Sequence, residues 1–163
     1  MPEPNDANPL LSIQFRVPFD RIRAAGVEPA IGELLAQARA RLAAVAAEPV
    51  ERTFANTMLA LDLMTELLDY AMGVVRHLES VATTPELRAA FNAVQPSVSA
   101  FYSGIPLDAD LWRGIQAFAA TGESGRLTGE RRRFLEKTVE SFRRHGADQL
   151  RALSLFAVIV RQL

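Results

Sequence analysis

The sequence predicts an all-α protein, folded as a multi-helix bundle of about six helices. Apolar residues recur at three- and four-residue steps along most of the chain, which is the period of a helix face. Prolines, glycines and capping residues stand where such helices would start and stop. The 163 residues include 49% hydrophobic residues and no cysteine, so packed side chains and not disulfides must hold the fold together.

The bundle is predicted to form around a long central helix at about residues 53–82, with Thr53 as its N-cap. Two apolar stripes run along this segment, and acidic and basic residues fill the narrower remainder. A helix with one partner needs one apolar stripe, so two stripes predict neighbours on two sides. The first stripe comprises Met58, Leu61, Leu68, Met72 and Val75, and the second comprises Leu59, Leu63, Leu67, Val74 and Leu78.

Other helices are predicted on both sides of the central one. Thr84-Pro85-Glu86 combines a capping hydroxyl, a proline at the first helical position and an acid in the first turn, which is a strong start signal. Pro96 is expected to kink the helix that follows. The remaining predictions are a helix at about 27–47, the kinked helix at 85–104, a helix at 108–120, a loop at 121–125, and a helix from Thr128 to His145 that Gly146 ends.

The two ends of the chain are predicted to differ from this pattern. Residues 1–17 are expected to be extended, because Pro2, Pro4 and Pro9 interrupt a polar run. Residues 18–163 then form a single helical domain, which opens with a short helical turn at 18–22 closed by Gly26. The apolar segment 149–163 is predicted as a sixth helix, although 157–160 alone also suits a strand. Leu10, Leu11, Ile13 and Phe15 are the residues expected to anchor the N-terminal segment in a surface groove.

The charge balance argues against nucleic acid and membranes as partners. The chain has 18 basic and 19 acidic residues, so no overall field favours a polyanion. No stretch approaches the roughly 18 uninterrupted apolar residues of a membrane span, and the first residues lack the features of a signal peptide. We therefore expect a soluble, cytoplasmic protein.

No constellation of catalytic or metal-binding residues stands out. His77 and His145 lie far apart and neither belongs to an H-E-x-x-H motif, which would supply two zinc ligands from one helix face. A histidine in the last turn of a helix, such as His145, more often serves the carbonyl end of that helix. We therefore predict no catalytic, cofactor-binding or metal-binding residue in this chain.

Charged side chains on the predicted helices favour an ordinary solvated surface. Glu66 with Asp69, and Glu136 with Glu140, have the one-turn spacing of paired carboxylates, which exposed helices show routinely. The densest basic run is interleaved with glutamates at ion-pairing distance, so a salt-bridged helix is a better interpretation than a nucleic-acid site. That run comprises Arg131, Arg132, Arg133, Lys137, Arg143 and Arg144.

Ten short stretches stand in order over about residues 8–148. They are Asn8–Leu11, Pro18–Ile22, Val27–Ile31, Thr53–Thr57, Gly73–Val81, Thr84–Arg88, Phe91–Asn92, Phe101–Tyr102, Leu127–Arg132 and Phe142–Asp148. In this order they resemble the N-terminal helical region of the oligopeptidase A and thimet oligopeptidase family of zinc metallopeptidases. None is diagnostic alone, but the ordered set is specific. Two departures are Glu79, where the resemblance implies asparagine, and the apolar segment after Asp148, where it implies a charged helix.

The resemblance implies a role without chemistry of its own. Family members are several times longer, and their zinc-binding H-E-x-x-H helix lies far downstream, so no catalytic residue is carried over. In the family this region is part of the wall of a deep channel that admits only short, unstructured peptides. The resemblance therefore implies a detached or truncated N-terminal domain, inactive alone, with zinc bound by the parent enzyme and not by this chain.

Alternative functions remain open at this stage. The main alternative is a stand-alone helical module of the same origin that binds peptides or a protein. A weaker one is a small enzyme that uses Glu or Asp residues together with His77. The expected partner is the catalytic domain of a parent peptidase, or a second copy, bound through the apolar segment 150–163.

Overall fold

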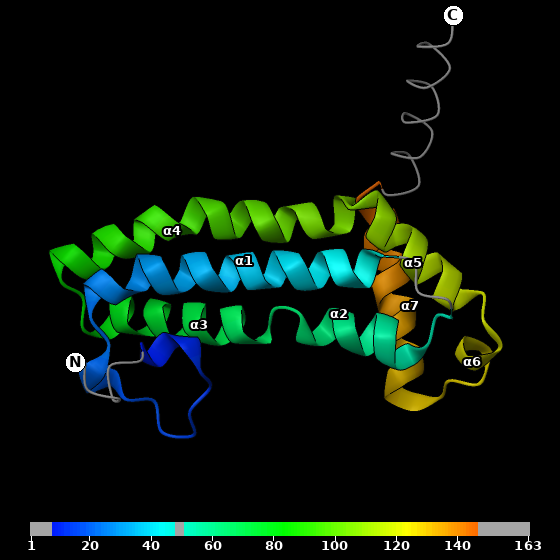
Figure 1. Cartoon of the computed structure of the whole chain (residues 1–163), viewed down its shortest axis with the longest axis horizontal. Coiled ribbons are helices and arrows are strands. Elements are labelled where there is room, and N and C mark those ends of the chain that lie inside the picture. Colours follow the sequence, from blue (N-terminus) through cyan, green and yellow to red (C-terminus); the bar gives the residue numbers. More distant parts are fainter. Residues whose placement is uncertain (1–7, 48–50, 147–163) are drawn as a thin grey trace, which may run out of the picture. The chain divides into compact units, whose positions relative to one another are not determined.

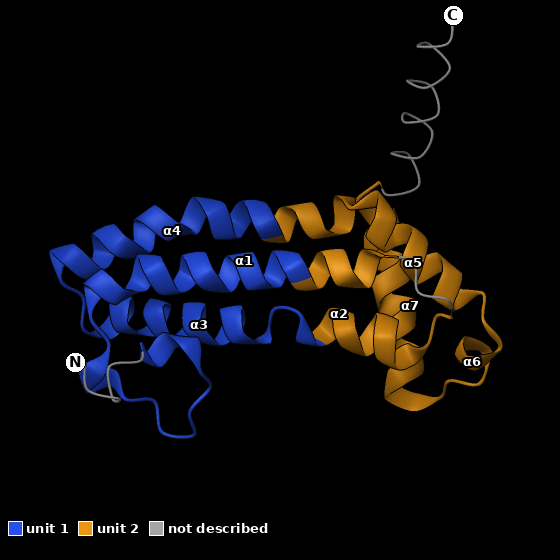
Figure 2. Ribbon diagram, viewed as in Figure 1, with its two compact units in different colours: residues 1–40, 63–101 blue, residues 41–62, 102–163 orange. Residues whose placement is uncertain are grey.

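The computed structural model describes residues 8–47 and 51–146, and these residues form helices and no strand (Figure 1). The predicted all-α, multi-helix fold class is therefore confirmed. The chain divides into two compact units, coloured separately in Figure 2: unit 1 comprises residues 1–40 and 63–101, and unit 2 comprises residues 41–62 and 102–163. The single domain predicted for residues 18–163 includes parts of both units and stays a prediction.

Unit 1 is built from three long helices that bury one face each. They are α1 (Val27–Ala46), whose last residues belong to unit 2, α3 (Glu66–Val81) and α4 (Pro85–Gly104), whose last residues also do. Apolar positions at helical spacing supply the core, as the sequence predicts. The buried side chains include Val27, Ile31, Leu34, Leu35 and Ala38 of α1, Leu68, Met72 and Val75 of α3, and Leu87, Phe91, Val94, Val98 and Phe101 of α4.

The start of α4 follows its predicted signal. The backbone N–H of Leu87 donates to the hydroxyl of Thr84 at 3.2 Å, and Pro85 is the first helical residue. Proline removes one backbone donor from a helix interior, yet α4 continues through Pro96 to Gly104. Pro96 therefore does not end the helix.

Three short 3₁₀ helices precede α1: η1 (Pro9–Leu11), η2 (Phe19–Arg21) and η3 (Ala24–Gly26). The first lies inside the segment predicted to be extended, packs against α3 and buries Leu10. Ile13 and Phe15 are exposed, so their predicted role as anchors in a groove is wrong. The turn predicted near residues 18–22 is present as η2.

Apart from α7, which has 16 residues like α3, unit 2 consists of shorter elements, and its core is rich in aromatic rings. The elements are η4 (Phe54–Leu59), which has π-helical geometry, α2 (Ala60–Leu63), η5 (Ile105–Leu107), α5 (Ala109–Ala119), α6 (Gly122–Gly125) and α7 (Gly129–Arg144). Trp112 stacks on Phe142 with ring centroids 5.6 Å apart. The buried core comprises Val45, Met58, Leu111, Trp112, Ile115, Phe118, Leu135 and Phe142.

The predicted central helix is interrupted. Its residues are helical from Phe54 to Leu63 and again from Glu66 to Val81, but Met64 and Thr65 lie outside both helices. Met64, a residue of neither predicted stripe, is buried at this interruption. Leu59 and Leu63 of the second stripe are exposed, whereas Val74 of the same stripe is buried, so that predicted contact face is covered only in the part after the interruption.

Two further predictions need correction in detail. The loop predicted at residues 121–125 contains the helical turn α6, because the Thr121 hydroxyl accepts from the backbone N–H of Ser124 and caps it. Thr128 occupies the N-cap position of α7, but its side chain makes no cap hydrogen bond. Gly146 ends α7 with a φ of 85°, as predicted for a glycine at a helix end.

The prediction of a sixth helix at 149–163, its strand alternative, and the proposed contact through 150–163 all lie outside the described residues. Of the helices that the structure does describe, none is long and apolar enough to cross a membrane.

Candidate functional site

The two histidines lie in different units and serve local packing. The ring of His77, on α3, lies 5.6 Å from the ring of Phe19, and both residues are exposed. The Nδ1 atom of His145 lies 2.7 Å from the carbonyl oxygen of Ser141, which is the end-of-helix role predicted for it. Within residues 8–47 and 51–146, no three His, Asp or Glu side chains come together as a metal site would require.

The two predicted carboxylate pairs lie on exposed helix surfaces. Glu66 and Asp69 are both exposed in the first turn of α3. Glu136 and Glu140, on α7, instead pair with basic residues. A hydrogen bond and the charge of Lys137, together with those of Arg144, lower the pKa of Glu140. A general acid needs the opposite shift, so Glu140 is not suited to donate a proton near neutral pH.

The basic run on α7 is a salt-bridged helix surface, as predicted. Arg132 pairs with Glu136, and Lys137 and Arg144 both pair with Glu140, each at 2.7 Å. The guanidinium carbon of Arg131 lies 5.0 Å from the centre of the Phe54 ring, in a cation–π contact. These cations thus have partners within unit 2, which leaves less of their charge for a polyanion.

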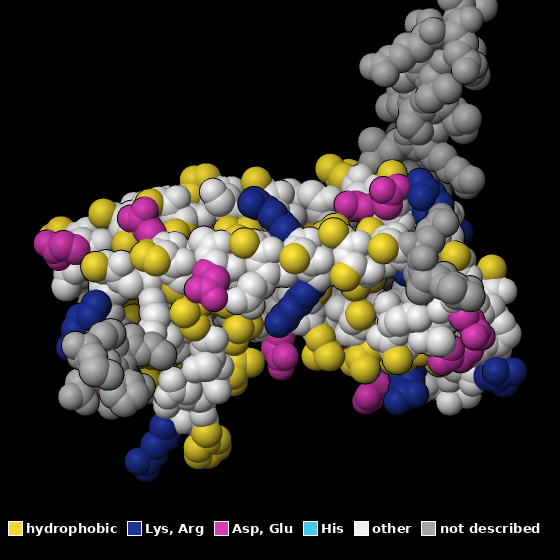
Figure 3. Space-filling view, viewed as in Figure 1, with side chains coloured by type: hydrophobic (Ala, Val, Ile, Leu, Met, Phe, Trp, Pro, Cys, Tyr) yellow, Lys and Arg dark blue, Asp and Glu magenta, His cyan; other side chains and the backbone are white. Residues whose placement is uncertain are grey.

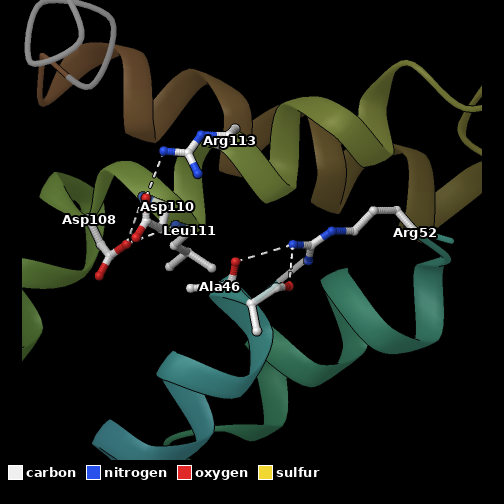
Figure 4. Close-up of polar contacts among 7 residues, drawn as sticks. Ala46, Arg52, Asp108, Asp110, Leu111 and Arg113 are labelled. Atoms are coloured by element: carbon white, nitrogen blue, oxygen red, sulfur yellow. Dashed lines mark hydrogen bonds and ion pairs between the residues drawn. The ribbon is translucent and has the colours of Figure 1, made fainter. Parts of the chain in front are cut away.

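The most strongly organised polar site of the described chain is a junction in unit 2, which we call the Arg52–Asn56 junction (residues 52–56). Arg52 is only 9% exposed and donates to three backbone carbonyls at the end of α1. Figure 4 shows the contact with Ala46. The distances are 2.7 Å to Val45, 3.3 Å to Ala46 and 2.7 Å to Ala47. The last carbonyls of a helix have no partner within the helix and carry partial negative charge, so a guanidinium is a fitting cap.

A glycine makes room for this arginine. A Cβ atom at position 114 of α5 would lie 2.8–2.9 Å from the guanidinium atoms of Arg52, closer than side chains normally approach. The same helix begins at Asp108, whose carboxylate accepts from the backbone N–H groups of Asp110 and Leu111 (Figure 4). The missing side chain at Gly114 therefore leaves room on α5 for the guanidinium of Arg52.

The next residues of the junction start η4. The Thr53 hydroxyl accepts from the backbone N–H of Asn56 at 3.2 Å, and the Asn56 side chain accepts from the backbone N–H of Thr53 at 2.9 Å. This is a reciprocal capping box, with asparagine in place of the more usual glutamate or glutamine. The prediction of Thr53 as an N-cap is confirmed.

Phe54 ties the junction to distant parts of unit 2. Its backbone N–H donates to the Glu123 carboxylate at 3.2 and 3.3 Å, across 69 residues of chain. Its ring packs edge-on against Phe118 at 6.3 Å and lies under Arg131. The junction is thus held by backbone capping and packing, and its groups are committed to structure and not to a reaction.

Sequence reasoning found part of this junction and missed the rest. Thr53–Thr57 was singled out, but Arg52 and Glu123 were not, because each acts on backbone groups that only the fold brings near. The one available signal was a lone arginine directly before a helix start, which many surface positions share.

Comparisons with known proteins place these features in a family. Residues 31–150 match the family model described as "Neurolysin/Thimet oligopeptidase, N-terminal domain". The organellar oligopeptidase A of Arabidopsis thaliana is 30% identical over 134 residues, which cover 82% of this chain and 17% of that protein. Oligopeptidase A of Haemophilus influenzae is 27% identical over 140 residues, covering 86% of this chain and 20% of that protein. The dipeptidyl carboxypeptidase of Escherichia coli is 30% identical over 145 residues, covering 86% and 21%. The chain thus spans about a fifth of the length of the curated relatives it matches.

Proposed function

Because the chain belongs to the neurolysin/thimet oligopeptidase N-terminal domain family, we propose that it is the non-catalytic N-terminal part of a zinc-dependent oligopeptidase and forms part of its substrate-channel wall. The single observation that carries this proposal is the family match over residues 31–150. The names of the relatives, oligopeptidase A and dipeptidyl carboxypeptidase, supply the substrate class: peptides.

The zinc ion of such an enzyme would bind to polypeptide outside these 163 residues. The sequence contains no H-E-x-x-H motif. Of the described histidines, His77 contacts the ring of Phe19 and His145 contacts a carbonyl at the end of α7. The residues present therefore do not fit a zinc site, and no step of peptide cleavage is assigned to them. The proposed contribution of this chain is structural: it forms part of the wall of the substrate channel.

A channel wall must be rigid, and unit 2 has structural features that make it so. A folded protein is excluded only if the wall does not yield, which requires a packed core and fixed helix ends. Unit 2 provides the Trp112–Phe142 stack and the Arg52–Asn56 junction.

We also propose a cytoplasmic location for the enzyme, because a chain without cysteine suits a reducing compartment.

A fusion experiment tests the proposal. The full 163-residue chain is joined to Haemophilus influenzae Oligopeptidase A in place of the segment of that protein aligned with it. We expect the fusion to bind zinc, to cleave short peptides and to spare folded proteins, whereas the full chain alone binds no zinc and cleaves nothing. Removal of zinc with a chelator should abolish cleavage by the fusion, and added zinc should restore it.

The controls separate the possible outcomes. The remainder of the relative without any N-terminal segment shows what the chain contributes, and replacement of the H-E-x-x-H glutamate by glutamine shows that cleavage depends on that motif. A fusion that folds but does not discriminate between short peptides and folded proteins would refute the wall function. Stoichiometric zinc or peptide turnover in the chain alone would refute its non-catalytic role.

A further inference from the structure

A loop of unit 1, residues 12–21, is held firmly at both ends. Before it, the side chain of Asn8 donates to the carbonyl of Gly26 at 2.7 Å and accepts from the backbone N–H of Leu10 at 3.1 Å. Leu10 is buried, and η1 packs against α3. After the loop, Ile22 is buried. The loop is therefore presented from a fixed base and is not a free terminus.

The 12–21 loop displays apolar side chains to solvent. Phe15 is fully exposed, Ile13 is 52% exposed and Phe19 is 43% exposed. Figure 3 shows a hydrophobic side chain projecting from this loop next to a basic one. Single exposed apolar residues are ordinary, but three within seven residues on an anchored loop mark an interaction surface.

The charges around the loop limit the chemistry of a partner. The segment 12–23 contains three basic residues, Arg16, Arg21 and Arg23, and one acidic residue, Asp20. The guanidinium of Arg23 donates to the backbone carbonyl of Asp20, which helps to fix the loop's shape. A partner surface that fits would offer an apolar pocket for Phe15 and a carboxylate for the exposed Arg16.

We propose that the 12–21 loop is the surface by which this N-terminal domain docks on the catalytic part of the peptidase, with Phe15 as the anchor residue. The inference rests on the proposed function. In the relatives, about four-fifths of the chain lies outside the aligned segment, so a protein of that length has a large additional part on which the loop can dock. One buried aromatic in the centre of a patch typically carries a large share of binding energy.

Two other occupants fit the observations less well. A second copy would bring two sets of arginines together across a symmetric contact, and like charges oppose each other there. An anionic membrane is usually bound by clusters of about four to eight basic residues, whereas three arginines against one aspartate leave an excess of two.

The test uses Phe15→Ser in two settings: the full chain alone, and the fusion with the remainder of Haemophilus influenzae Oligopeptidase A. In the fusion we expect the half-life of peptidase activity at elevated temperature to shorten by about tenfold, because the anchor contact between the two parts is lost. In the full chain alone we expect no change in Tm, because Phe15 is fully exposed in the part of the chain that the structure describes. Val81→Ser is the matched control, since Val81 is an exposed apolar residue of the same unit that belongs to α3 and not to the loop. It should change neither value.

Each remaining outcome decides the question. An active fusion whose half-life is unchanged by Phe15→Ser overturns the docking role while leaving the proposed function intact. An inactive parent fusion, in contrast, removes the proposed function and the inference with it. Phe15-dependent binding of the full chain to phosphatidylglycerol vesicles, or a Phe15-dependent dimer in sedimentation velocity, would assign the loop to another partner and overturn the proposal.

Discussion

The Arg52–Asn56 junction and the 12–21 loop both adjoin stretches that resemble the same peptidase family. They differ in how far their side chains are buried and hydrogen-bonded within this chain. In the junction, Arg52 is buried and donates to three carbonyls, and Thr53 and Asn56 cap each other. In the loop, Phe15 and Ile13 are exposed. The junction thus has its partners within this chain, whereas for the exposed side chains of the loop we propose a partner outside it. Family resemblance alone does not separate these two kinds of residue.

The largest expected loss of stability is for a substitution in the core of unit 1, the unit that also contains the 12–21 loop. Leu68→Ala removes a fully buried side chain of α3, and such truncations cost about 2–5 kcal/mol in the free energy of unfolding. Urea denaturation monitored by circular dichroism measures this cost. A wild-type midpoint in that variant would show that α3 does not pack as described.

Arg52→Met should cause the next largest loss in the free energy of unfolding. It keeps much of the side-chain volume but leaves the carbonyls of Val45, Ala46 and Ala47 without this donor, at a cost of about 2–4 kcal/mol. The same denaturation experiment applies. Gly114→Ala should act on the same contact, so the double variant should lose less than the sum of the two single losses. Additive losses would mean that Gly114 and Arg52 are independent.

Thr53→Ala tests the capping box of the junction. The substitution removes the hydroxyl that accepts from the backbone N–H of Asn56, and loss of an N-cap costs about 1 kcal/mol. Thr128→Ala is a matched control, because Thr128 is an N-cap residue whose side chain makes no cap hydrogen bond. Equal losses in the two variants would contradict the structural distinction between them.

A smaller effect is expected for the exposed ion pairs of α7, and it should depend on pH. Hydrogen bonds and charge from Lys137 and Arg144 lower the pKa of Glu140 in the folded protein. A lowered pKa stabilises the fold above the ordinary pKa of a glutamate, and this contribution is lost as the pH falls through the lowered value. The Tm difference between wild type and Glu140→Gln should therefore shrink on acidification and on addition of salt. A constant difference would mean that the pairs do not contribute in solution.

The smallest change in stability is expected for a substitution of Phe15 in the 12–21 loop. Phe15→Ala in the full chain alone should change the free energy of unfolding by no more than about 0.5 kcal/mol, as is usual for surface substitutions. Thermal denaturation of the two proteins side by side measures it. A loss comparable to that of Leu68→Ala would show that Phe15 is buried in solution and would remove the contrast between loop and junction.

The amino-acid sequence by itself determined the all-α class, the position of most helices, the Thr53 and Thr84 caps and the family. These features depend on local spacing and on residues that act within a few positions of themselves, so one chain read in order is enough to find them.

Only the tertiary structure decided the rest. The interruption at Met64–Thr65 is invisible to periodicity because apolar residues continue through it, and it decides that Met64 is buried and Leu63 exposed. The contacts of Arg52 with the end of α1 and of Glu123 with Phe54 join groups that local sequence does not relate. Whether an apolar side chain is core or surface depends on which neighbours the fold brings to it, and for Phe15 the described part of this chain brings none.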